Sequence, residues 1–182
     1  MNVVGRLLLA CILILGSGLF VNAQKTDATK GEPSNKLNSD DHKFLSNAAE
    51  GGQAEVEFAQ LALKKSQNPG VREFANRMIQ DHGKANQELK ALASSKGLKW
   101  PKGIGAMNNA ELLKLKALSG DTFDRSYVDS MVDDHKRDVG EFEKASQGAV
   151  DVDLKNFAGK TLPTLEEHYK LIQTLQKKLQ PQ

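Results

Sequence analysis

The stretch that decides the fold is residues 71–92, which read VREFANRMIQDHGKANQELKAL. Its apolar residues recur at steps of four and three, the spacing of one face of an α-helix, and His82 falls on that same face. The alternation of apolar and polar residues that marks a half-buried strand is absent from it. The stretch therefore predicts a helix that carries a histidine on its buried face.

The same spacing recurs in three other blocks of the chain. They run from Leu45 to Leu63, from Val128 to Phe142 and from Leu154 to Leu179. The boundaries agree with this pattern, because Asn68-Pro69 places a capping residue before a proline that starts a helix, and Gly148 separates the last two blocks. The sequence predicts an all-α fold, a four-helix bundle over residues 40–180.

A long connection separates the second and third predicted helices. Residues 97–120 contain Gly97, Pro101, Gly103 and Gly105, followed by an apolar helical stretch from Leu112 to Leu118. Roughly ten extended and ten helical residues could cover ~48 Å, enough to run back along a ~28-residue helix. This length favours a ferritin-like topology with a long crossover, although a simple up-down-up-down bundle with a decorated loop stays open.

The fourth predicted helix contains Pro163. A proline inside a helix removes a backbone hydrogen bond and clashes with the preceding turn. We therefore expect a kink or a break at this position.

The first residues have the pattern of a secretory signal peptide. Arg6 precedes an apolar run from Leu7 to Val21, and Ala23 supplies the small residue that signal peptidase accepts. We expect residues 1–23 to be a signal peptide cleaved between Ala23 and Gln24, residues 24–39 to be a disordered leader, and the domain to lie in the periplasm or elsewhere outside the cytoplasm. Cleavage would leave no stable membrane span, whereas an uncleaved anchor is the alternative.

Charge and composition exclude several classes of function. The 25 Lys and Arg residues nearly balance the 23 Asp and Glu residues, and the aromatic residues are spread singly, which argues against a nucleic-acid partner. No Gly-x-Ser-x-Gly, Walker or His-Glu-x-x-His motif is present. The single cysteine, Cys11, lies in the predicted signal peptide, so any metal in the mature chain must be held by nitrogen and oxygen ligands.

Three of the four histidines occupy buried-face positions on three different helices. His82 and His135 each lie ~20 Å along their helices, near the middle of the bundle in either topology. His168 lies about one turn farther from the middle of its own helix, a mismatch that a kink at Pro163 would absorb or that would exclude it from a shared site. A buried imidazole needs partners for both ring nitrogens, so three at one depth call for a common explanation.

Acidic residues accompany these histidines. Glu55 is the acidic residue within the apolar face of the first helix, and Asp81 and Asp134 immediately precede His82 and His135. Because neighbours i and i+1 on a helix do not face each other, Asp81 is better placed to orient a histidine of the adjoining helix.

Two interpretations of these residues remain open. In one, Glu55, His82, His135 and His168 bind one Zn, Fe, Mn or Cu ion, with Asp81 and Asp134 behind the ligands. A di-iron centre is less well supported, because no Glu-x-x-His pair is present. In the other, the same groups form a metal-free polar network in a non-catalytic envelope or stress-related interaction module, which needs no cofactor. Protein partners and the oligomeric state, including a homo-oligomer, cannot be derived from the residues.

Several short motifs together resemble the exported bacterial family DUF4142. They are Ala48-Ala49-Glu50-Gly51-Gly52, Ala54-Glu55-Val56-Glu57, Met78-x2-Asp81-His82, Gly120-x2-Phe123-Asp124-x2-Tyr127, Met131-x3-His135 and Leu162-Pro163-x-Leu165-x2-His168. The resemblance covers about Ser39 to Leu175. It implies a ferritin-like bundle in envelope proteins of unassigned biochemical role, with recurrent Glu and His positions at Glu55, His82, His135 and His168.

Overall fold

The computed structural model describes residues 37–180, so the predicted signal peptide and residues 24–36 of the predicted leader lie outside the described residues. The described part is all-α and contains five helices: α1 (Ser39–Lys65), α2 (Pro69–Ser95), α3 (Gly105–Ala117), α4 (Gly120–Gly148) and α5 (Val152–Leu179). The all-α prediction is confirmed, but there is one helix more than the four expected. The additional helix, α3, forms within the connection, where the apolar stretch from Leu112 to Leu118 lies.

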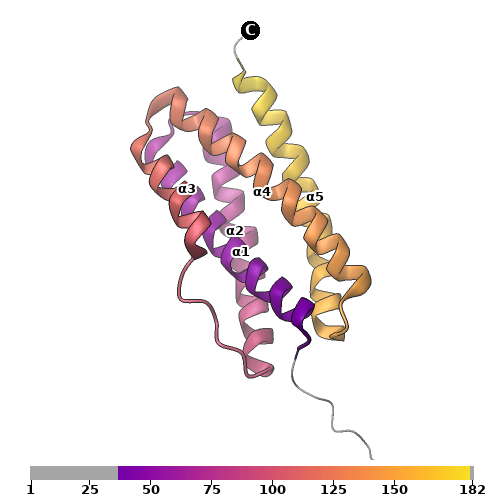
Figure 1. The fold of residues 1–182 in the computed structure, drawn as a ribbon. Helices are drawn as coiled ribbons and strands as arrows, with labels where there is room; N and C mark the ends of the chain where they lie inside the picture. The colour runs from indigo at the N-terminus through magenta and orange to yellow at the C-terminus, as the bar shows by residue number, and fades with distance from the viewer. Residues whose placement is uncertain (1–36, 181–182) are drawn as a thin grey trace, which may run out of the picture. The chain divides into compact units, whose positions relative to one another are not determined.

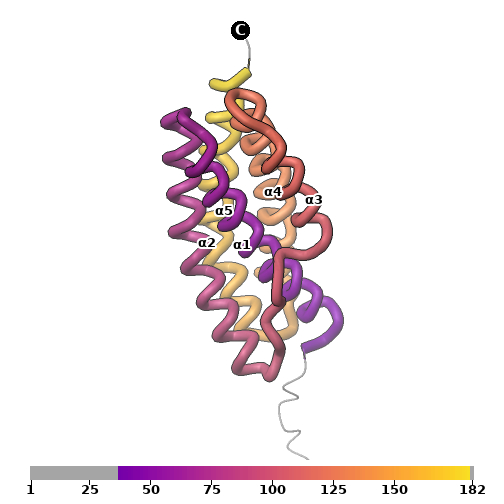
Figure 2. Tube along the Cα trace, turned by 90° about the vertical axis from the view of Figure 1, so that its left-hand side faces the viewer, coloured from indigo at the N-terminus to yellow at the C-terminus, as the bar shows by residue number. Residues whose placement is uncertain are grey.

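The four long helices lie side by side, with α1 packed mainly on α2 and α4 mainly on α5. Figure 1 shows α2 and α4 running in the same direction, because residues 96–104 and α3 carry the chain back along the bundle between them. Figure 2 shows α3 on the outside, where it packs on α1 and, less closely, on α4. Trp100 Nε1 donates to Gln53 Oε1 at 3.0 Å, and Lys65 Nζ donates to two carbonyls near the end of α3, so α1 holds the connection in place.

Side chains at the helix starts explain several boundaries. Asn68 accepts hydrogen bonds from the backbone N–H groups of Gly70 and Val71, and Pro69 is the first residue of α2, which confirms the predicted start. Asp151 caps α5 in the same way. Ser119 precedes α4 without a side-chain hydrogen bond. The chain does not break at Pro163, since α5 continues through it as one helix; the kink stays a prediction.

The core consists of two apolar clusters, one toward each end of the bundle. The first includes Phe58, Met78, Phe123, Met131 and Ile172, and the second includes Leu45, Leu89, Phe142, Leu154 and Leu165. On each long helix, the members of one cluster precede those of the other along the chain. Every long helix therefore passes through a layer of the bundle that lies between the two clusters.

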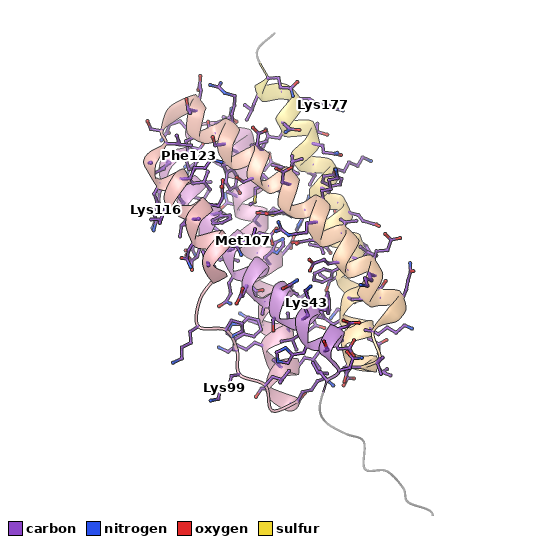
Figure 3. The ribbon with its side chains drawn as sticks, viewed as in Figure 1. Lys43, Lys99, Met107, Lys116, Phe123 and Lys177 are labelled. Atoms are coloured by element: carbon purple, nitrogen blue, oxygen red, sulfur yellow. The ribbon has the colours of Figure 1, made fainter. Side chains whose placement is uncertain are left out.

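Charged side chains cover the outside of the bundle. Lys43, Lys99, Lys116 and Lys177 are exposed and come from widely separated parts of the bundle, as Figure 3 shows. None of the helices within residues 37–180 combines the length and the apolar character that crossing a membrane requires.

The buried carboxylate of Asp41 ties the start of α1 to the start of α5. It accepts the backbone N–H groups of Val150 at 3.2 Å and Asp151 at 2.7 Å. Asp41→Ala is expected to lower the free energy of unfolding by about 1–3 kcal/mol, because two donors lose a charged acceptor. Urea denaturation measures this loss, and Asp40→Ala, at an exposed neighbouring position, is the matched control. Equal losses in both variants would contradict a role for this contact.

Candidate metal centre

Four of the predicted site residues lie in the layer between the two apolar clusters. Glu55 comes from α1, His82 from α2, His135 from α4 and His168 from α5. All four are buried, with exposed fractions between 0% for His135 and 6% for His82. Each of these four side chains points inward because the helical period places it on the same face as the core residues before and after it.

The three imidazoles form a nearly equilateral triangle. Ring centroids are 5.5 Å apart for His82 and His135, 5.4 Å for His82 and His168, and 5.5 Å for His135 and His168. One nitrogen from each ring can be chosen so that all three lie within 4.8 Å of one another. Since metal–nitrogen bonds are about 2.0–2.1 Å long, closing on one ion requires only small inward shifts of the rings.

An acceptor faces one nitrogen of each ring. Asp81 Oδ2 lies 2.9 Å from His168 Nε2, and the carbonyl oxygen of Met131 lies 2.9 Å from His135 Nδ1. Glu55 approaches at ion-pair distance, with Oε2 2.8 Å from His82 Nδ1 and Oε1 3.3 Å from His135 Nδ1. Carbonyl and carboxylate oxygens only accept, so His135 Nδ1 and His168 Nε2 carry the protons and, in a neutral imidazole, the other nitrogen has a free lone pair.

The remaining nitrogens are buried without a partner. They are His82 Nε2, His135 Nε2 and His168 Nδ1. Leaving a polar atom buried and unpaired costs about 1–3 kcal/mol, so three such atoms on neighbouring rings need a compensating ligand. A ring whose outer nitrogen donates to a carboxylate or carbonyl while its inner nitrogen faces a shared point is typical of metal-binding histidines. These residues therefore fit a metal ion.

Burial and charge set the protonation of the centre. Burial raises the pKa of Glu55, but the neighbouring His82 and His135 outweigh it and bring the pKa down to about 2. Burial lowers the pKa of His168 to about 4, against the opposing effect of its hydrogen bond to Asp81, and it also lowers the pKa of His135. Burial alone would lower the pKa of His82 as well, but Glu55 raises it above the ordinary value. Glu55 is thus a fixed negative charge beside the rings.

His168 and Glu55 are expected to make the metal-free protein less stable in acid, whereas the raised pKa values of Asp134 and Asp138 act in the opposite direction. The pKa of His168 is 6.5 ordinarily and about 4 in the folded chain, so the unfolded chain binds more protons and stability is lost as the pH falls from 6.5 to 4. The contribution of Glu55 is complete above its ordinary pKa of 4.5 and is lost toward its folded value of about 2. His82, with a raised pKa, acts in the opposite direction, because its contribution is complete below 6.5 and is lost at higher pH.

Urea denaturation of the metal-free protein across this pH range measures the effect. His168→Gln is expected to flatten the profile between pH 6.5 and 4, because Gln does not titrate. A variant profile parallel to that of the unmodified protein would show that His168 is not held neutral by the fold.

Asp81 and Asp134 have different surroundings, although each immediately precedes a histidine in the sequence. Asp81 reaches from α2 across to His168 on α5. Asp134 instead accepts a hydrogen bond from Arg137 at 2.7 Å on its own helix, and within residues 37–180 it has no hydrogen bond to a histidine. The supporting role of Asp134 behind the ligands stays a prediction. Burial, together with the charge of Glu55, raises the pKa of Asp134 to about 6.

Sequence reasoning also missed two neighbours of the centre. The Met131 carbonyl is a backbone group, and no sequence pattern predicts which imidazole a backbone carbonyl will contact. Phe74 packs edge-on against two of the rings, with centroid distances of 5.9 Å to His135 and 6.3 Å to His168. Its position two helical turns before His82 on the same face was the available signal.

Comparison with known families places the chain. The model of a family described as a domain of unknown function (DUF4142) matches residues 26–175. The chain belongs to the DUF4142 family. The resemblance carried by the sequence motifs is thereby confirmed. No curated protein matches the DUF4142 chain.

Solved structures of similar fold come from other proteins. A DUF305 fragment from Deinococcus radiodurans matches with a TM-score of 0.69 and 15% identity, over 78% of this chain and 98% of that one. CopM in the Cu(II)-bound form matches with a TM-score of 0.65 and 16% identity, over 77% and 97%. CopM in the Cu(I)-bound form matches with a TM-score of 0.67 and 18% identity, over 78% and 98%. At these identities the likeness shows the fold alone.

Proposed function

We propose that this DUF4142 chain is an extracytoplasmic, ferritin-like four-helix bundle that binds one transition-metal ion through His82 Nε2, His135 Nε2 and His168 Nδ1. The observation that carries the proposal is the set of three buried, unpartnered nitrogens on facing rings. The acceptors behind the rings support it, because they favour the tautomer in which each inner nitrogen is free to bind.

Glu55 has a supporting role in this proposal. The group of side chains close enough to share an ion contains the three histidines and no carboxylate. Glu55 faces the outer nitrogens of His82 and His135, so it orients two rings and offsets part of the charge of the ion. The geometry favours this role over the direct ligand role that the sequence suggested.

Imidazole suits Zn, Fe, Mn and Cu alike, so the three rings do not by themselves choose among these ions. The similar fold of CopM, which has been solved with Cu(II) and with Cu(I), supports testing copper first.

Export accounts for the choice of ligands. A signal peptide over residues 1–23 would deliver a chain without cysteine to an oxidising compartment, where imidazole ligands persist but thiols are oxidised. Sequencing the N-terminus of the protein recovered from the periplasm tests this proposal. Gln24 as the first residue is expected, and an N-terminus at Met1 would contradict it.

Metal analysis tests the proposed function. Protein purified without chelators is expected to carry about one transition-metal ion per chain, and adding the ion to the stripped protein should raise its melting temperature, since binding to the folded state stabilises it. A chain that is empty as purified and shows no change in melting temperature with Cu, Zn, Fe or Mn would contradict the proposal.

A second candidate function is a non-catalytic interaction module with a metal-free polar core. The contacts of Glu55 with His82 and of Asp81 with His168 favour it, because they form without an ion. For this function, apolar residues of similar volume in place of the histidines leave folding and partner capture intact. Metal-dependent melting would contradict it.

A further inference from the structure

A groove runs between α2 and α5 beside the three-histidine centre. Its volume is about 530 Å³, and residues of both helices line it, among them Glu73, Phe74, Arg77, Asp81, Leu171 and Lys178. These residues lie along the α2 stretch that precedes His82 and the α5 stretch that follows His168. The groove therefore extends along the side of the bundle from the level of the centre toward the start of α2 and the end of α5.

Two lining residues touch the histidines directly. Phe74 is only 5% exposed, and its ring meets those of His135 and His168 edge-on at 5.9 and 6.3 Å between centroids. Asp81 has a side chain 40% exposed, yet its Oδ2 lies 2.9 Å from the buried Nε2 of His168. One aromatic ring and one carboxylate thus stand between the groove and the imidazoles.

A second groove between the same helices provides a comparison. Its lining includes Glu88, Leu92, Phe157 and Lys160. Phe157 is as deeply buried as Phe74, at 4% exposed, but it packs against Phe142 in the apolar cluster that lies beyond the histidines. This groove includes none of the residues that contact the centre.

We propose that metal ions enter and leave the three-histidine centre through the groove lined by Phe74 and Asp81, with the Phe74 ring as the gate. This inference rests on the proposed metal-binding function. Phe74 offers no ligand atom, so its displacement lowers the barrier for entry and exit alike and leaves the affinity unchanged. Gating of this kind acts on rates.

Arg77 sets the charge at the mouth of the groove. Its Nη1 lies 2.9 Å from Glu167 Oε1 and its Nε lies 3.8 Å from Asp81 Oδ2, so one guanidinium offsets two carboxylates that would attract a cation. Removing this positive charge speeds the encounter with a metal ion, and salt screens the effect.

Stopped-flow kinetics with Cu²⁺ alone, on the full mature chain, tests the gate. Phe74→Leu is expected to raise the association and dissociation rates by about tenfold each while the dissociation constant stays within about threefold, because a barrier lowered by ~1.4 kcal/mol acts in both directions. The matched control is Phe157→Leu, which truncates an equally buried phenylalanine in the second groove and is expected to keep the rates of the unmodified protein.

Arg77→Gln tests the route without touching the core. It is expected to speed association about threefold at low ionic strength, with the difference lost at high salt. Lys160→Gln, which breaks the comparable pair with Glu88 beside the second groove, is expected to change nothing.

The outcomes separate this route from the function on which it rests. Unchanged rates in both Phe74→Leu and Arg77→Gln, with the ion still bound by three histidines, would overturn the route and leave the proposed function standing. Equal acceleration in Phe157→Leu would also overturn it, because the bundle would then be loosened generally. Failure of the unmodified chain to bind any of Cu, Zn, Fe and Mn would overturn both.

Discussion

Replacing His135 with Leu is expected to abolish tight metal binding while the helical bundle still folds. His135 is fully buried and carries one of the three nitrogens that we propose as ligands, so its replacement leaves two of them. Removal of a supporting partner behind a ligand lowers affinity 10–100-fold, and loss of the ligand itself should exceed about 100-fold. Leu fills a similar volume, but it leaves the buried Glu55 Oε1 without its His135 partner, so the metal-free variant is expected to lose some stability and still fold.

Competition with a chromophoric chelator measures the affinity, and circular dichroism checks the fold. The matched control is His42→Leu, which removes an exposed histidine near the start of α1. Retention of metal affinity by His135→Leu, or an equal loss in His42→Leu, would contradict a centre built on the three buried rings.

Glu55→Gln is expected to lower the metal affinity about 10–100-fold without abolishing binding. The amide keeps the size of the side chain but loses the negative charge that faces His82 and His135. Both rings then lose the group that orients them and offsets the charge of the ion. The same chelator competition gives the result, with Glu57→Gln, exposed on the same helix, as the control.

The size of this effect separates two roles for Glu55. A loss as complete as that of His135→Leu would mean that the carboxylate binds the ion directly, as the sequence suggested. No loss at all would mean that its charge is irrelevant to the centre.

The helical spacing of the sequence identified the candidate residues, but it did not predict where their side-chain atoms lie. His82, His135 and His168 were identified because they interrupt apolar faces, and the structure brings their rings within 5.5 Å of one another. His168 is level with the other two despite its expected offset of one turn. The expected offset was counted in residues from the start of each helix, which assumes that all helices begin at the same height in the bundle. The short turn between α4 and α5 does not force these helices to do so.

Supporting contacts were harder to predict because they depend on neighbours from other helices. Asp81 and Asp134 each immediately precede a histidine, yet within residues 37–180 only Asp81 forms a hydrogen bond to a histidine. Arg137 follows Asp134 by three residues and donates a hydrogen bond to its carboxylate. Arg77 lies one turn before Asp81, but its closest contact is Glu167 on α5, so Asp81 stays close to His168.

Anomalous diffraction at the copper edge, from crystals of the protein loaded with one equivalent of copper, tests the central claim most directly. We expect a single strong peak about 2 Å from each of His82 Nε2, His135 Nε2 and His168 Nδ1. Copper found only on surface side chains, with the three rings facing one another as in the metal-free protein, would contradict the claim.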